Sequence, residues 1–214
     1  MLSLILKDLL IQKKNLIFAF LYIIFIMYIM QSQLMDATLS ICICAISYIT
    51  LSSASAYDDR SNGNIFLNTL PLSRGKIVLS KYVSLFIYAA LTIVIYFVIY
   101  LFTSSLNLKI TLYPVTLDGI IYGLFLVSIM YSLSLPVFFK FGYMKSKWIQ
   151  FIIFFLFFGG ISYIIKFLES RFSNILLGFG GFKGLTMLFI IILSFIILLI
   201  SYCLSVYFYK RREF

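Results

Sequence analysis

The sequence predicts an all-α integral membrane protein with about six transmembrane helices. Of its 214 residues 63% are hydrophobic and 11% are charged, against roughly 25% charged in a typical soluble domain. Apolar stretches recur at the length of about 20 residues that a helix needs to cross a bilayer. Lys and Arg fall between these stretches. A soluble fold of this length could not bury so much apolar surface.

The predicted spans follow one another with short connections. Residues 1–14 precede them and place Lys7, Asp8 and Lys13 among regularly spaced apolar residues. This pattern predicts an amphipathic helix in the membrane interface, and a cytosolic extension of the first span remains an equal alternative. The six spans cover about 15–30, 34–57, 77–102, 116–137, 148–165 and 185–209.

The basic residues predict the orientation of the chain. Most of the 17 Lys and Arg lie in residues 1–14, 58–81 and 139–147 or after Tyr209. Because cytoplasmic connections carry the excess of Lys and Arg, these segments and both termini are expected in the cytoplasm. Residues 58–81 then form a cytosolic loop and 166–184 an extracellular one. We expect one multi-pass domain over residues 1–214 in the plasma membrane.

Composition also excludes several function classes. The chain has no histidine, which removes Ser-His catalysis and histidine-ligated metal sites. It has no G-x-x-x-x-G-K-[ST] motif, so ATP cannot be bound through a P-loop of its own. The acids lie at or outside the predicted span ends, which argues against an ion-coupled carrier. The net charge of +10 has no polar domain to present it to nucleic acid. We predict a chain that is no enzyme and binds no cofactor or metal.

The longest polar interval is the loop 58–81. Its centre predicts a short helix, in which Ile65, Phe66, Thr69 and Leu70 share one face and Asn62, Asn64 and Asn68 lie elsewhere. Pro71 ends this helix, because the residue before a proline is driven from α geometry. Such a helix suits a groove on a soluble partner, and a surface-lying helix without a partner is the open alternative.

The end of this loop leads into the third span. Ser73 is a plausible N-cap for that helix. Arg74, Lys76 and Lys81 follow it, and we expect them where lipid phosphates or an acidic partner surface can meet them.

Two segments resemble the ABC-2 type transporter permeases. The first combines Asp58-Asp59-Arg60, Gly63 and LPLSR at 70–74 with Lys81-Tyr82; the second is PVFFKFGYMK at 136–145. The resemblance implies a permease subunit that pairs with an identical or paralogous permease and with two ABC ATPase subunits, which bind ATP and Mg. It also implies export of amphipathic or hydrophobic cargo such as peptides, toxins or antibiotics. The alternatives are a membrane immunity, sensor or scaffold protein and, less favoured, an ion-coupled secondary carrier.

The resemblance further implies a coupling helix between the second and third spans, with the ATPase contact in and around it. Many family members carry an acid directly after Gly63, where this chain has Asn64. Asp58 and Asp59 are then the only local acids that could form an ion pair with the ATPase, and which of them does so, if either, stays open. The implied coupling residues are Asp58, Asp59, Arg60, Asn62, Asn64, Ile65, Phe66, Asn68, Thr69, Leu70, Pro71 and Arg74.

Overall fold

The computed structural model describes residues 2–12, 18, 20–25, 37–61, 73–105, 114–157, 159–160 and 183–212. Every regular element in these residues is a helix. Five of the helices are α1 Leu2–Ile11, α3 Thr38–Arg60, α5 Arg74–Ser105, α6 Leu117–Phe141 and α8 Lys183–Arg211. Residues 143–157 form a further helix, named helix 143–157 below.

Four described helices are long and apolar enough to cross a membrane: Thr38–Arg60, Arg74–Ser105, Leu117–Phe141 and Thr186–Arg211. They correspond to the second, third, fourth and sixth predicted spans, which confirms these four. The first predicted span is described only at residues 18 and 20–25, and the fifth only up to residue 160. The count of six spans therefore stays a prediction, as does the membrane side of the termini. The predicted extracellular loop 166–184 lies almost entirely outside the described residues.

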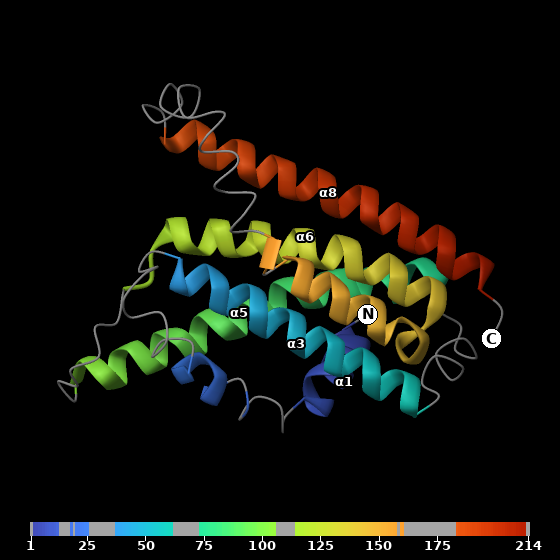
Figure 1. Ribbon diagram of the computed structural model, residues 1–214, viewed down its shortest axis with the longest axis horizontal. Helices are drawn as coiled ribbons and strands as arrows, with labels where there is room; N and C mark the ends of the chain where they lie inside the picture. Colours follow the sequence, from blue (N-terminus) through green and yellow to red (C-terminus); the bar gives the residue numbers. More distant parts are fainter. Residues whose placement is uncertain are drawn as a thin grey trace.

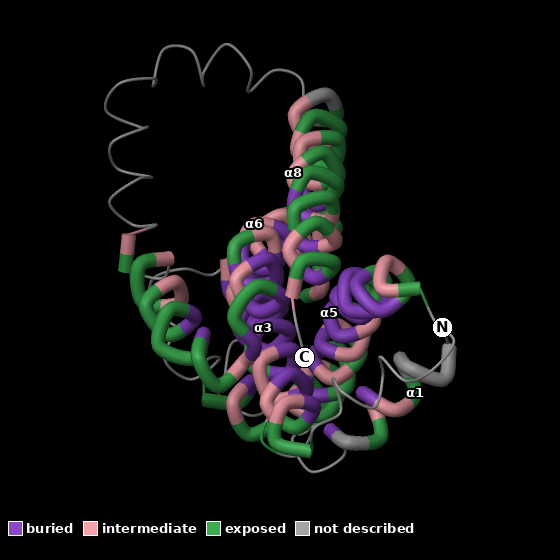
Figure 2. The backbone as a smooth tube through the Cα atoms, turned by 90° about the vertical axis from the view of Figure 1, so that its right-hand side faces the viewer, coloured by how far each residue is buried: buried purple, intermediate pink, exposed green. Residues whose placement is uncertain are grey.

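The central helix of the bundle is α3. It packs against α6 and α5, while α8 lies on α6 and α1 lies on the opposite side against α5 and α3 (Figure 1). In the most apolar window of α3, 72% of the residues are buried, against 11% in α8 (Figure 2). This difference makes α3 the core of the bundle and leaves most apolar side chains of α8 exposed on its surface.

The closest approach of α3 and α6 depends on small residues. A Cβ atom placed on Gly123 of α6 would lie 2.9 Å from Ile43 Cδ1 and 3.2 Å from Ser40 Cα, both on α3. Small residues let helix backbones approach in lipid. Small and hydroxyl residues also gather near the end of α3, where Thr50, Ala54 and Ser55 are buried. Gly123 supplies the matching surface on α6.

We expect Gly123→Val to force α3 and α6 apart, because the backbone of Ser40 cannot move away like a flexible side chain. Overpacking of this kind costs about 1–3 kcal/mol. Detergent-induced unfolding of the purified chain should show the loss as an earlier midpoint. Gly160→Val is the matched control, since nothing in the described residues lies within 4 Å of a Cβ placed there. Equal midpoints for the two variants would contradict the packing role of Gly123.

Four helix ends meet at one end of the bundle, namely the C-terminal ends of α3, α6 and α8 and the start of α5 (Figure 1). The Arg74 guanidinium donates hydrogen bonds to the carbonyl oxygens of Tyr209 at 3.2 Å and Lys210 at 2.8 Å. These contacts satisfy carbonyls that the end of a helix leaves without intrahelical partners. The structure thus places the ends of these helices together. The distribution of Lys and Arg predicts that the same segments share one side of the membrane.

Candidate functional site

The connection between α3 and α5 is the predicted coupling segment. Residues 62–72 lie outside the described residues. The structure therefore does not test the roles of eight predicted coupling residues: Asn62, Asn64, Ile65, Phe66, Asn68, Thr69, Leu70 and Pro71. It does place the remaining four, Asp58, Asp59, Arg60 and Arg74, on the two helix ends that flank this connection.

A buried charge cluster lies beside these helix ends, formed by Lys7 and Asp8 of α1, Asp58 of α3 and Lys81 of α5. The Lys81 Nζ atom donates to Asp8 Oδ2 and to Asp58 Oδ2, each at 2.7 Å. The Lys7 Nζ atom donates to Asp58 Oδ1 at 2.5 Å and lies 3.5 Å from Asp8 Oδ1. Asp8, Asp58 and Lys81 are 3%, 2% and 4% exposed. The two lysines and two aspartates balance in charge.

The hydrogen bonds of Gln12 extend this cluster. Its Nε2 atom donates to the Thr50 carbonyl oxygen and, at 3.1 Å, to the Tyr88 hydroxyl. Gln12, directly after α1, follows Asp8 by four residues. Thr50 precedes Asp58 by eight residues in α3 and Tyr88 follows Lys81 by seven in α5, so each of these two pairs lies on one face of its helix. One polar face of α1 therefore meets one face of α3 and one face of α5.

The cluster fixes the relative positions of three helices. Removing one partner of a buried ion pair is strongly destabilising because the other charge stays buried without compensation. A shift of α3 against α5 would separate Asp58 from Lys81, and a shift of α1 would expose the Asp8 carboxylate. The two sides of the α3–α5 connection and α1 are thus held as one unit.

One expectation from the sequence is wrong in the light of this geometry. Lys81 does not reach lipid phosphate or a partner surface, because two buried carboxylates hold its amine inside the bundle. The Asp58 carboxylate, one of the two local acids that could pair with the ATPase, is bound within the chain by Lys7 and Lys81, and its role in ATPase coupling stays a prediction. For α1, neither the interfacial nor the cytosolic placement anticipates that Asp8 and Gln12 are buried against α3 and α5.

A comparison with known families decides the class of protein. The family model described as "ABC-2 family transporter protein" matches residues 3–210. The chain belongs to this family. No curated protein and no solved structure matches it. The family confirms the resemblance seen in residues 58–82 and 136–145, makes the chain a membrane-spanning permease component and implies an ABC ATPase as its partner.

In this ABC-2 family chain, Asp59 has a structural contact. Its Oδ2 atom accepts a hydrogen bond from the Met144 backbone N–H at 3.0 Å. Met144 lies in the first turn of helix 143–157, where backbone N–H groups lack intrahelical partners and a negative charge is favoured. Gly142 makes the preceding turn with φ of 75°, a backbone conformation that favours glycine. Asp59 thereby connects the end of α3 to the start of helix 143–157.

Asp59→Ala is expected to weaken the first turn of helix 143–157, because the Met144 N–H loses its acceptor. Loss of such a cap costs about 1 kcal/mol, which corresponds to about fivefold faster exchange of the Met144 amide hydrogen. Hydrogen–deuterium exchange on the permease measures this directly. Asp59→Asn keeps an acceptor oxygen and should retain most of the protection. Unchanged exchange in the Ala variant would show that Asp59 does not cap this helix.

The remaining two flanking residues differ in environment. Arg60 is exposed and lines a cleft between α3 and helix 143–157. Arg74 holds the end of α8 through the two carbonyl contacts described above. Among the described residues, no group of three or more His, Cys, Asp and Glu could hold a metal ion.

Sequence reasoning missed Asp8, Gln12 and Tyr88. One signal could have found them: charged residues within apolar helices need a partner when the helix packs in a membrane bundle. Lys7-Asp8 sits between leucine residues, and Lys81 is the one charged residue among the buried residues of α5.

Proposed function

We propose that this ABC-2 family chain is the permease subunit of an ATP-driven exporter and that ATPase motion enters it through residues 62–72. Two ATPase copies would bind two permease chains, identical or paralogous, in the plasma membrane. The cargo class that suits this proposal is an amphipathic or hydrophobic peptide, toxin or antibiotic. The chain itself hydrolyses no ATP, and ATP and Mg belong to the partner.

The observation that supports this coupling route best is the charge cluster. Asp58 lies four residues before the segment 62–72 and Lys81 nine residues after it, and their side chains bond at 2.7 Å. A force on the segment therefore acts on α3 and α5 together. It also acts on α1, because Asp8 shares Lys81 with Asp58. The proposed mechanism is a joint movement of α1, α3 and α5 that begins at this segment.

The proposed roles of the flanking residues follow from their contacts. Asp58 would hold α3 to α5 and α1 during coupling. Asp59 and Arg74 would carry the movement to helix 143–157 and to the end of α8. The face formed by Ile65, Phe66, Thr69 and Leu70 would dock on the ATPase, with Pro71 as the corner that leads into α5.

Co-purification from the native membrane tests the proposal. A tagged chain should bring down an ATPase with a P-loop motif, at one ATPase per permease chain. Export into inverted vesicles should require ATP and persist when the proton gradient is collapsed. Isolation without any ATPase would favour an immunity, sensor or scaffold role, and transport that needs the gradient but no ATP would favour a secondary carrier. Either outcome contradicts the proposal.

A further inference from the structure

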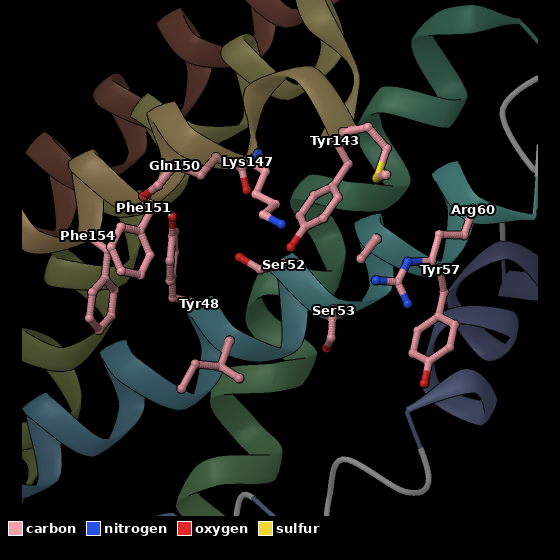
Figure 3. Close-up of a pocket in the computed structure, with 13 residues that line it drawn as sticks. Tyr48, Ser52, Ser53, Tyr57, Arg60, Tyr143, Lys147, Gln150, Phe151 and Phe154 are labelled. Atoms are coloured by element: carbon pink, nitrogen blue, oxygen red, sulfur yellow. Dashed lines mark hydrogen bonds between the residues drawn. The ribbon is translucent and has the colours of Figure 1, made fainter.

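A cleft of about 670 Å³ opens between α3 and helix 143–157. At one end lie Arg60 of α3 and Lys147 and Tyr143 of the opposite helix segment (Figure 3). Figure 3 shows the Lys147 amine and the Tyr143 hydroxyl pointing toward Ser52. At the other end the lining is aromatic. The volume is in the range of about 300–1,000 Å³ that small-molecule sites occupy.

The charge at the mouth of this cleft is positive and uncompensated in the described residues. Arg60 and Lys147 are both exposed, and neither forms an ion pair in the part of the chain that the structure describes. The described lining contains no acidic side chain. The nearest acid, Asp59, turns its Oδ2 atom to the Met144 N–H at the rim. The mouth is therefore suited to an anion.

The floor of the cleft is apolar. Tyr48 stacks on Phe154 with ring centroids 5.5 Å apart, and Phe151 lies beside them (Figure 3). Ile49 and Ser53 line this cleft and also a second hollow of about 490 Å³ on an adjoining face of α3, which Phe18 and Leu21 help to form. Two apolar spaces thus adjoin one cationic mouth.

The position in the bundle matches the level of lipid headgroups. Arg60 is the last residue of α3. Trp148, next to Lys147, is 70% exposed, and tryptophan with basic residues is typical of a membrane–water interface. Basic pockets between transmembrane helices bind anionic headgroups. The phosphate of a membrane lipid could therefore supply the anion at this cleft.

We propose that this cleft is a binding site for an anionic phospholipid of the bilayer. The lipid phosphate lies between Arg60 and Lys147 and accepts hydrogen bonds from the Ser52 and Tyr143 hydroxyls. One acyl chain follows Tyr48, Phe151 and Phe154, and the hollow beyond Ile49 holds the other. This inference does not rest on the proposed export function, because it concerns the permease chain alone.

The chain offers its own probe, because Trp148 is its only tryptophan. The full chain is placed in phosphatidylcholine bilayers, and quenching of Trp148 by brominated phosphatidylglycerol is compared with quenching by brominated phosphatidylcholine. The wild type should prefer phosphatidylglycerol. Arg60→Gln with Lys147→Gln should lower that preference by about tenfold or more, and Arg60→Gln alone by about fivefold.

Lys140→Gln with Lys145→Gln is the matched control, since it removes two charges nearby that do not line the cleft. It should keep the preference, as should Arg60→Lys with Lys147→Arg. The proposal is overturned if the wild type shows no preference for phosphatidylglycerol or if Arg60→Gln with Lys147→Gln keeps that preference. It is also overturned if Lys140→Gln with Lys145→Gln loses the preference to the same extent. Displacement of the brominated phosphatidylglycerol by soluble glycerol phosphate would show a site for a simple anion instead of a lipid. Efficient crosslinking of Phe151→Cys between two copies would show that a second chain covers the cleft.

Discussion

Lys81→Met should destabilise the permease by about 3–5 kcal/mol, because Asp8 and Asp58 would remain buried with Lys7 as their remaining cation. The Lys81 amine is the atom that both carboxylates share, each at 2.7 Å. Its loss leaves two negative charges against one positive charge inside the bundle. Detergent-induced unfolding should show a much earlier midpoint. Hydrogen exchange should rise first in α1, which the cluster anchors.

Lys76→Met is the matched control for this loss, because Lys76 is an exposed lysine of the same helix. Substitutions at such positions usually change stability by less than about 0.5 kcal/mol. Combining Lys81→Met with Asp8→Asn and Asp58→Asn should recover much of the stability, because the one charge then left is that of Lys7, whose side chain is 35% exposed and can reach solvent. A loss in the single variant no larger than in the control would contradict the internal role of Lys81.

Phe66→Asp with Leu70→Asp should abolish ATPase binding while membrane insertion stays normal. Both side chains belong to the predicted docking face of the segment 62–72. Anchors in a buried interface often contribute 2 kcal/mol or more each, so we expect a loss of affinity on the order of 100-fold or more. The two introduced carboxylates would also enter the predicted groove of the ATPase, which is expected to accept apolar side chains. Pull-down of the ATPase with the tagged permease measures the loss.

Ser61→Asp with Ser73→Asp is the control for charge at this segment. It adds the same two negative charges at exposed positions that flank the segment and are not among the predicted coupling residues, and ATPase recovery should stay near that of the wild type. Normal ATPase stoichiometry in the Phe66 and Leu70 variant would rule out the docking face. Equal losses in both variants would show that negative charge anywhere in the segment repels the partner.

Helix positions could be predicted from the sequence because length and hydropathy determine them. The predicted third span, 77–102, is α5 at Arg74–Ser105, and the predicted fourth, 116–137, is α6 at Leu117–Phe141. Ser73 was predicted as the residue before the third helix, and α5 begins directly after it. A bilayer requires about 20 mostly apolar residues in each span, so an apolar run bounded by polar residues locates a helix to within a few residues.

Side-chain pairing could not be predicted in the same way. Hydropathy treats Lys81 and Asp58 as polar residues at span ends and so places them at the surface. The structure pairs Lys81 with Asp8 across 73 residues and Lys7 with Asp58 across 51. No local pattern encodes such contacts, because they depend on which faces of three helices meet. The same holds for Gly123, whose role depends on its neighbours in α3.

In the proposed mechanism the charge cluster transmits ATPase motion rather than docking the ATPase. This is tested most directly by the rate of ATP hydrolysis by the purified permease–ATPase complex in which the permease carries Asp8→Asn, Asp58→Asn and Lys81→Met. We expect the ATPase to bind at the wild-type ratio, because residues 62–72 are unchanged. Permease-dependent hydrolysis and export should fall about tenfold or more, as expected when a coupling contact of about 1.4 kcal/mol or more is lost. Wild-type hydrolysis and export in this variant would contradict the proposed mechanism.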